Sequence, residues 1–193
     1  MKLVIASNNA NKIREIKEIL GGFFEEVFTL KDLGLDIEVE ETGETFEENA
    51  LIKAREISRV TGLPALADDS GLCVDCLDGA PGVYSARYAG PGHVDAENNA
   101  LLLKNMSDKT DRKASFSTVI ALVYPDGKYL TVEGKTYGEI LHAPEGKSGF
   151  GYDPLFFSYD LNKSFGLATP EEKNAVSHRG RALRALEEIL QKG

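Results

Sequence analysis

The chain has 193 residues, of which 42% are hydrophobic, which is enough to bury a sizeable core and excludes an intrinsically disordered protein. Its 31 acidic residues outnumber the 22 Lys and Arg, giving a net charge of −9. Proteins that bind duplex nucleic acid present a basic stripe, so nucleic acid is excluded as the main partner. An acidic protein that handles a polyphosphate must use a few local cations together with a metal ion.

The apolar run Leu3–Ala6 stops at Ser7 and is too short for a signal peptide or a membrane span, so we expect a cytoplasmic protein. The two cysteines, Cys73 and Cys76, form a lone C-x-x-C motif. A zinc site would need two more ligands, and the three histidines are scattered along the chain. We interpret both cysteines as ordinary structural residues.

The first third of the chain alternates strands with helices. Apolar residues spaced three and four apart predict a helix that ends at about Leu20, where two glycines follow. A capping box, Thr45-Phe46-Glu47-Glu48, predicts a second helix ending near Gly62. The expected strands are residues 2–6, about 24–30 and 36–40.

The rest of the chain predicts a buried strand end at 65–67, a strand over 71–77 and a helix capped by Asp95. A turn, Pro125-Asp126-Gly127, joins a predicted β-hairpin, and a second capping box begins at Thr169. We expect one α/β domain over residues 1–193, built on a mixed sheet. The remaining expected elements are hairpin strands at 113–124 and 128–137, glycine-rich loops at 77–92 and 146–151, and an amphipathic final helix at about 178–191.

A polar turn, Ser7-Asn8-Asn9-Ala10-Asn11-Lys12, connects the first strand to the first helix. Backbone N–H groups and the positive end of a helix make such a turn a natural anion cradle, and Lys12 adds a positive charge. A simple capped helix start is the alternative interpretation. The turn lacks the glycines of a Rossmann or P-loop motif, and Gly146-Lys147-Ser148 is not a P-loop because position 141 is Leu where that motif needs Gly.

Carboxylates are concentrated in two places. Seven lie between Asp36 and Glu48 without a cation among them, and a solvated face explains most of these. Asp68 and Asp69 differ because they directly follow the apolar residues 65–67. Carboxylates at the carboxyl end of a strand lie where ligands bind α/β sheets, and they are the oxygen ligands that Mg²⁺ prefers.

A third group lies towards the C-terminus: Phe150-Gly151-Tyr152-Asp153-Pro154, Lys173 and Ser177-His178-Arg179. Two aromatic rings beside glycines in a loop are able to stack on a nucleobase. A guanidinium such as that of Arg179 can donate to a keto oxygen. The alternatives are an aromatic core contact and a helix start capped by Ser177.

Six sequence blocks follow one another in order and cover the chain from Ser7 to the final helix. Their succession resembles the inosine triphosphate pyrophosphatase family, also called XTP/dITP diphosphatases. The blocks are Ser7–Lys12, Phe46-x-x-Asn49-Ala50-x-x-Lys53-Ala54, Ala67-Asp68-Asp69-Ser70-Gly71-Leu72, Gly79-x-Pro81-Gly82-Val83-Tyr84-Ser85-Ala86-Arg87-Tyr88, Phe150–Pro154 and Ser177-His178-Arg179.

The resemblance implies an elongated mixed sheet flanked by helices, with two lobes and a deep substrate cleft. It also implies a homodimer. The implied activity is Mg²⁺-dependent hydrolysis of non-standard purine nucleoside triphosphates (ITP, dITP, XTP) to the nucleoside monophosphate and pyrophosphate, which removes them from the nucleotide pool.

The resemblance also implies roles for individual residues. Asp69 matches the metal-binding general base, and Ser70 matches a substrate contact. Glu40 matches the second metal ligand if Gly43 is the family's reference glycine, with Glu41 as the alternative, and the sequence does not decide whether Asp68 or Asp69 accepts the proton. The triphosphate positions are Ser7, Asn8, Asn9, Ala10, Asn11, Lys12 and Lys53; the purine positions are Phe150, Gly151, Tyr152, Asp153, Lys173, His178 and Arg179.

Two rival functions are weaker. A pyrophosphatase for modified pyrimidines is disfavoured by the Phe150–Asp153 and His178-Arg179 blocks. A non-catalytic purine-nucleotide sensor would not need metal-ligand carboxylates such as Asp69. We therefore expect an enzyme that prefers 6-oxo purines, with Arg179 donating to the oxygen.

Overall fold

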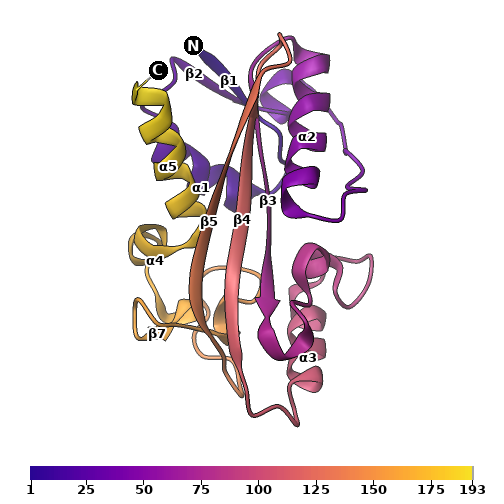
Figure 1. The fold of residues 1–193 in the computed structure, drawn as a ribbon, viewed down its shortest axis with the longest axis vertical. Helices are drawn as coiled ribbons and strands as arrows, with labels where there is room; N and C mark the ends of the chain where they lie inside the picture. Colours follow the sequence, from indigo (N-terminus) through magenta and orange to yellow (C-terminus); the bar gives the residue numbers. More distant parts are fainter. Residues whose placement is uncertain (193) are drawn as a thin grey trace. The chain divides into compact units, whose positions relative to one another are not determined.

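The computed structural model describes residues 1–192 and contains one open, seven-stranded sheet in the order β2-β1-β3-β4-β5-β6-β7 (Figure 1). β1 runs parallel to both β2 and β3, whereas β6 runs antiparallel to both β5 and β7. The predicted mixed α/β sheet is confirmed. The strands are β1 Lys2–Ile5, β2 Glu26–Thr29, β3 Ala65–Val74, β4 Lys113–Val123, β5 Tyr129–Ile140, β6 Phe156–Ser158 and β7 Lys163–Ser164.

Five α-helices accompany the sheet within residues 1–192, and each of them is too short or too polar to cross a membrane. Both predicted capping boxes are confirmed: Thr45 with Glu48 opens α2, and Thr169 with Glu172 opens α4. The helices are α1 Ala10–Leu20, α2 Phe46–Thr61, α3 Asp95–Asn105, α4 Pro170–Val176 and α5 His178–Lys192. Short 3-10 helices are η1 Lys31–Leu33, η2 Asp75–Leu77, η3 Gly82–Arg87, η4 Asp153–Leu155 and η5 Phe165–Leu167.

The chain divides into two compact units. The first unit contains Met1–Asp69, Thr118–Gly134 and the chain from Arg179 onward. The second unit contains Ser70–Ser117 and Lys135–His178. The long strands β3, β4 and β5 contribute residues to both units, and the boundary in β3 falls directly after Asp69.

The first unit covers both faces of its strands with helices. Alternate side chains of a strand point to opposite faces, so Leu3 and Ile5 of β1 join one apolar cluster while Val4 joins another. The first cluster includes residues of α1 and α5, and the second includes residues of α2. Helices α1 and α5 therefore share one face, and α2 covers the other.

The second unit has an apolar core of its own. Phe116, Phe156 and Phe165 pack ring against ring, with centroid distances of 4.6, 5.1 and 6.1 Å. Buried residues of β3, α3 and β5 complete this core, which includes Leu72, Leu102 and Ile140.

Two strand predictions were wrong. Asp68 and Asp69 do not follow a strand end, because β3 continues through them to Val74 and stays paired beside β4. Residues 36–40 form an irregular segment rather than a strand. Their alternating apolar side chains, which motivated the strand prediction, pack against the α2-side cluster without joining the sheet.

The predicted cap at Asp95 was also wrong. Val94 occupies the N-cap position of α3, and Asp95 is the first residue of the helix. Its carboxylate instead accepts a hydrogen bond from the Gly151 N–H at 2.8 Å. The acid therefore anchors the glycine-rich loop of the second unit rather than the helix start.

Gly138 of β5 lies where the sheet leaves no room for a side chain. A Cβ atom there would come within 2.0 Å of the Phe157 carbonyl oxygen and 2.7 Å of the Phe156 ring. We predict that Gly138→Ala destabilises the protein by about 1–3 kcal/mol because of overpacking. Urea unfolding would measure this, with Gly22→Ala as the control, since nothing lies within 4 Å of a Cβ at Gly22. Equal midpoints for the two variants would contradict the close β5–β6 approach.

Candidate functional site

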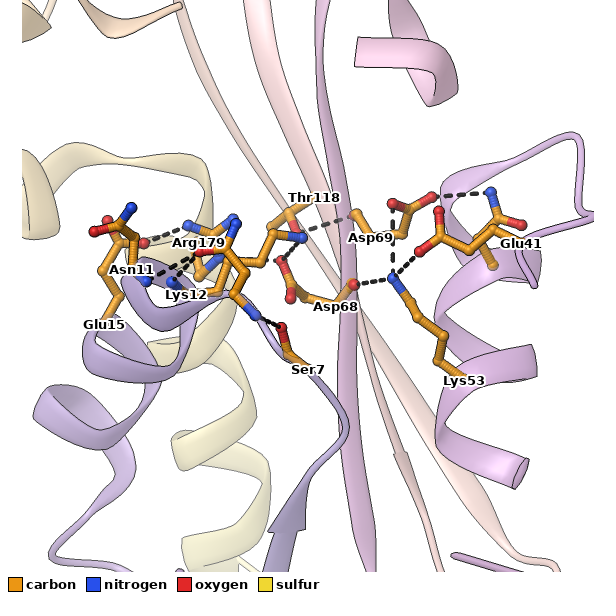
Figure 2. A network of polar contacts seen from close by, with 12 residues as sticks. Ser7, Asn11, Lys12, Glu15, Glu41, Lys53, Asp68, Asp69, Thr118 and Arg179 are labelled. Carbon is orange, nitrogen blue, oxygen red and sulfur yellow. Dashed lines mark hydrogen bonds and ion pairs between the residues drawn. The ribbon is translucent and has the colours of Figure 1, made fainter. Parts of the chain in front are cut away.

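Asp68 and Asp69 lie on opposite sides of strand β3 (Figure 2). Neighbouring residues of a strand point to opposite faces of the sheet. Asp68 therefore faces the α1 and α5 side, where Lys12 and Arg179 contact it, and Asp69 faces the α2 side, where Lys53 lies. Both carboxylates are buried, with exposures of 2% and 5%.

Asp68 is held between two cations. Its Oδ2 atom lies 3.1 Å from Lys12 Nζ and accepts a hydrogen bond from Arg179 Nε, also at 3.1 Å. Arg179 Nη1 donates in turn to the buried Glu15 carboxylate of α1. Burial acts to raise the pKa of Asp68, but the charges of Lys12, Arg179 and Lys53 outweigh it and hold that pKa far below its usual value. Asp68 therefore stays ionised near neutral pH, with its charge matched by these cations.

Asp69 has the opposite electrostatic character. Burial raises its pKa from an ordinary value of 3.8 to about 6, and the nearby Glu41 carboxylate adds to the shift while Lys53 opposes it. Asn49 Nδ2 donates to Asp69 Oδ2 at 3.0 Å and fixes the orientation of the carboxylate. Asp69 is therefore the member of the acid pair that is able to exchange a proton near neutral pH.

Helix α2 supplies the partners of Asp69. Asn49 and Lys53 are four residues apart and so share one helix face. Lys53 Nζ donates to Glu41 at 2.6 Å and to the Asp68 carbonyl oxygen at 2.7 Å, and it lies 3.9 Å from Asp69 Oδ1. Burial alone would lower the pKa of Lys53, but the charges of Asp69, Asp68 and Glu41 raise it. This lysine stays protonated among three oxygen atoms.

The Ser7–Lys12 turn uses several of its backbone donors internally. Asn9 is the N-cap of α1, and its Oδ1 atom accepts from the N–H groups of Asn11 and Lys12 at 3.0 and 3.2 Å. The Asn9 N–H donates to Ser7 Oγ at 3.1 Å. The turn therefore caps the start of α1, and it positions the Lys12 side chain towards Asp68.

The two glutamates that the sequence offered as metal ligands lie in different environments. Glu40 is exposed and lines a shallow hollow together with Arg55 and Glu56, whereas Glu41 is half-buried and contacts Lys53. Because alternate side chains of this segment point the same way, Glu41 shares the inward face of Val39. The sequence contained a signal for this: Ile37 and Val39 are the apolar members of an alternating pattern, and Glu41 is the next residue on the same side.

Over residues 1–192, no three side chains among His, Cys, Asp and Glu converge to hold a metal ion. Asp69, Glu41 and the Asp68 carbonyl oxygen nevertheless surround one cationic atom, Lys53 Nζ. These are hard oxygen donors, and Mg²⁺ is usually bound by one or two carboxylates together with substrate phosphate. These oxygens are therefore donors of the type that Mg²⁺ prefers, and Lys53 Nζ lies among them in this structure.

The second unit gathers most of the predicted base-reading residues. Lys173 is buried, and its Nζ atom lies 2.6 Å from Asp153 Oδ2 and 4.3 Å from the centre of the Phe150 ring. Asp153 also accepts from the Phe150 N–H at 2.9 Å. Gly149 has φ +74°, and a Cβ there would come within 2.0 Å of Asp153 Oδ2. A glycine is therefore required for the loop to close over this ion pair.

Two of the predicted purine contacts belong to the core of the second unit. Tyr152 is buried, and its hydroxyl donates to the Ser85 carbonyl oxygen at 2.6 Å. His178 is also buried and stacks on Phe116 with ring centroids 5.0 Å apart.

The other predicted substrate contacts are less buried. Ser70 is half-buried on β3, and the Gly151 N–H donates to Asp95. Of the two loop aromatics, Phe150 is the one with partial exposure.

Two residues without a predicted role, Asn49 and Glu15, also organise the site. Asn49 is fully buried and links Asp69 to the Gly43 N–H, which donates to Asn49 Oδ1 at 2.8 Å. Its spacing of four residues from Lys53 was the available signal. Glu15 binds Arg179 and lies three residues after Lys12. A charged residue on the buried side of α1 was the sequence signal for its role.

The fold and this geometry define a class: an α/β protein whose sheet carries two buried carboxylates, each paired with a lysine from a flanking helix. Lysines beside a proton-accepting carboxylate are suited to binding and hydrolysing a phosphate ester or anhydride.

The chain belongs to the Ham1 family, whose profile matches residues 3–189. It is 50% identical to the dITP/XTP pyrophosphatase of Clostridium perfringens over 98% of this chain and 97% of that protein. It is 51% identical to the protein of the same name in Geobacter sulfurreducens, over 98% and 96% of the two chains. The solved HAM1 protein of Coxiella burnetii is 43% identical and superposes with a TM-score of 0.91 over 100% of both chains.

The raised pKa of Asp69 makes a prediction about stability. Because the folded state holds its proton up to about pH 6 and the unfolded state releases it near 3.8, stability falls as the pH rises between these values. We predict that Asp69→Asn removes this cost and stabilises the metal-free protein by up to roughly 3 kcal/mol above that range, with little effect below it.

Thermal unfolding of both proteins in a chelator measures this difference at about pH 7.5, above the range, and at about pH 4.5, near its lower end, where most of the effect is absent. The control is Asp126→Asn, an exposed turn residue whose pKa is lowered mainly by its hydrogen bonds with Lys128. That control should not stabilise the protein at either pH. A destabilised Asp69→Asn variant at the higher pH would contradict the assigned pKa.

Proposed function

We propose that this protein hydrolyses non-standard purine nucleoside triphosphates, such as ITP, dITP and XTP, to the monophosphate and pyrophosphate. One observation carries the proposal: Asp69, an acid that exchanges its proton near neutral pH, lies beside Lys53 in a chain about half identical to dITP/XTP pyrophosphatases over nearly its full length. It follows that the protein would remove faulty nucleotides from the pool used by the cell.

Two lysines are assigned to the triphosphate. Lys12 comes from α1 and Lys53 from α2, so they approach β3 from opposite faces. In the free protein both are held by carboxylates. An ammonium group has three donors, so a phosphate oxygen would join the carboxylate as a further partner. Holding the phosphate chain from two sides would align the α-phosphorus with the attacking water. Asn9, as the cap of α1, would keep Lys12 in place at the start of its helix.

Asp69 is assigned the general base. Its pKa of about 6 leaves it mainly ionised at neutral pH, so it is able to accept a proton from the attacking water. Asn49 would keep the carboxylate in one orientation during that transfer. We assign Asp69 and Glu41 as the protein ligands of Mg²⁺. When bound, Mg²⁺ supplies positive charge that offsets the negative charge developing on the phosphates.

The Phe150–Asp153 loop and Lys173 are assigned to the base. Phe150 is partly exposed and offers a ring for stacking, and its position is fixed by Asp153 and Lys173. A protein donor facing C6 would favour the keto oxygen of inosine or xanthine over the amino group of adenine, because that donor would be left unpaired. The homodimer implied by the family resemblance, and the cytoplasmic location expected from the sequence, are part of the same proposal.

The products of the reaction test the proposal directly. Incubation of ITP with the protein and Mg²⁺ should give inosine monophosphate and pyrophosphate in one step, resolved by ion-exchange chromatography. A chelator should stop the reaction. Inosine diphosphate with orthophosphate as the first products would place cleavage at the other anhydride bond and overturn the assignment.

Asp69→Asn should nearly abolish turnover, because the amide neither accepts the proton nor provides a negative metal ligand. Loss of a general base typically lowers the rate by ~10²–10⁴. Steady-state pyrophosphate release would measure kcat, with Asp126→Asn expected to match the unsubstituted protein. Because the same variant is expected to be more stable, unfolding would not account for the loss. A folded variant that kept more than about a tenth of kcat would rule out this role.

A further inference from the structure

Four buried or nearly buried charges alternate in sign across three elements of the first unit. They are Glu15 and Lys12 on α1, Arg179 on α5 and Asp68 on β3 (Figure 2). Arg179 Nη1 donates to Glu15, Arg179 Nε donates to Asp68, and Lys12 Nζ pairs with the same Oδ2 atom of Asp68. The contacts therefore form a chain from Glu15 through Arg179 and Asp68 to Lys12, and its two ends lie three residues apart on α1.

Charge balance in this chain of contacts depends on Glu15. With it, two carboxylates face two cations in surroundings where the side chains of Glu15, Arg179 and Asp68 are 7%, 2% and 1% exposed. Without its charge, Asp68 would be the one carboxylate of this pair left beside Arg179 and Lys12. A buried guanidinium that loses one acid is drawn more strongly to the remaining one. The Asp68 oxygen shared with Lys12 would then be occupied by Arg179.

We propose that Glu15 is a positioning residue that sets the ammonium group of Lys12 for the triphosphate of the substrate. It acts by occupying one side of the Arg179 guanidinium, which leaves Asp68 Oδ2 available to hold Lys12. Glu15 itself touches neither a phosphate nor a reacting atom. The inference rests on the proposed function, because it assigns Lys12 to the phosphate chain.

Stability alone is a weak reason for these four charges. Apolar residues of matching volume often replace buried ion pairs with no loss of stability, and Glu15 has the buried Ile16 as its neighbour on α1. The planar fork of arginine binds two acids in a fixed geometry, which a lysine could not reproduce. The arrangement is therefore suited to fixing the position of a charge rather than to filling the core.

The test compares Glu15→Gln with Glu18→Gln in the full-length protein. Glu18 lies on the same helix but is exposed, and its ion pair with Arg14 spans 4.0 Å. For Glu15→Gln we expect the KM for ITP and the inhibition constant of pyrophosphate to rise about tenfold, as for loss of one charge-assisted hydrogen bond. We expect kcat to change little and the ITP-to-ATP ratio of kcat/KM to stay constant. Glu18→Gln should match the unsubstituted protein throughout.

A purely structural role would instead reduce the active fraction, lowering kcat while leaving KM and pyrophosphate inhibition unchanged; that result would overturn the inference. A changed ITP-to-ATP ratio would also overturn it, because Glu15 would then act on the base.

If Glu15→Gln does not fold, Glu15→Asp keeps the charge but withdraws it from Arg179. It should raise both constants in the same direction, and unchanged constants in that folded variant would contradict the proposal. An unsubstituted protein that releases no pyrophosphate from ITP would overturn the proposed function instead.

Discussion

Successive side chains of a β-strand point to opposite faces of the sheet, and this constraint separates Asp68 from Asp69. The two residues are chemically identical and adjacent, yet one faces Lys12 and Arg179 while the other faces Lys53, Asn49 and Glu41. The two carboxylates therefore differ in their protonation behaviour. One carboxylate has a strongly lowered pKa and serves as a fixed anion, and the other has a raised pKa and is able to exchange a proton.

The two faces of β3 receive their partners because each face is covered by its own helices. Leu3 and Ile5 direct one side of β1 to the cluster shared with α1 and α5, and Val4 directs the other side to the α2 cluster. The same apolar contacts that cover the sheet therefore deliver a lysine to each side of Asp68 and Asp69. In the first unit the packing of α1 and α2 on the sheet also sets the positions of Lys12 and Lys53.

The charges at this site oppose the general preference for an apolar interior. Burying a carboxylate is unfavourable unless cations and hydrogen bonds compensate it. Asp68 is fully compensated, whereas the raised pKa of Asp69 shows that its compensation is incomplete. An acid left partly uncompensated is also one that remains able to bind a cation or a proton. Burial of ionised Asp69 therefore lowers the stability of the fold at the position where the proposed chemistry takes place.

The sequence by itself determined the features that depend on neighbouring residues. The capping boxes at Thr45 and Thr169 fixed two helix starts because their hydrogen bonds span three residues. The Asp68–Asp69 pair was predicted as the acid pair of the site from its place after an apolar run, and both carboxylates are buried. The strand containing that pair was predicted too short, because the pairing of β3 beside β4 is not a local property.

Tertiary structure alone decided which side chains meet across the chain. Glu15 and Arg179 are 164 positions apart, and no local pattern joins them. The choice of Glu41 over Glu40 as the neighbour of Lys53 followed from the packing of Val39 against the α2-side cluster, which turns Glu41 inward and Glu40 outward. Local spacing sets the face on which a side chain lies, but the order of strands and the helices packed on each face determine what that side chain contacts.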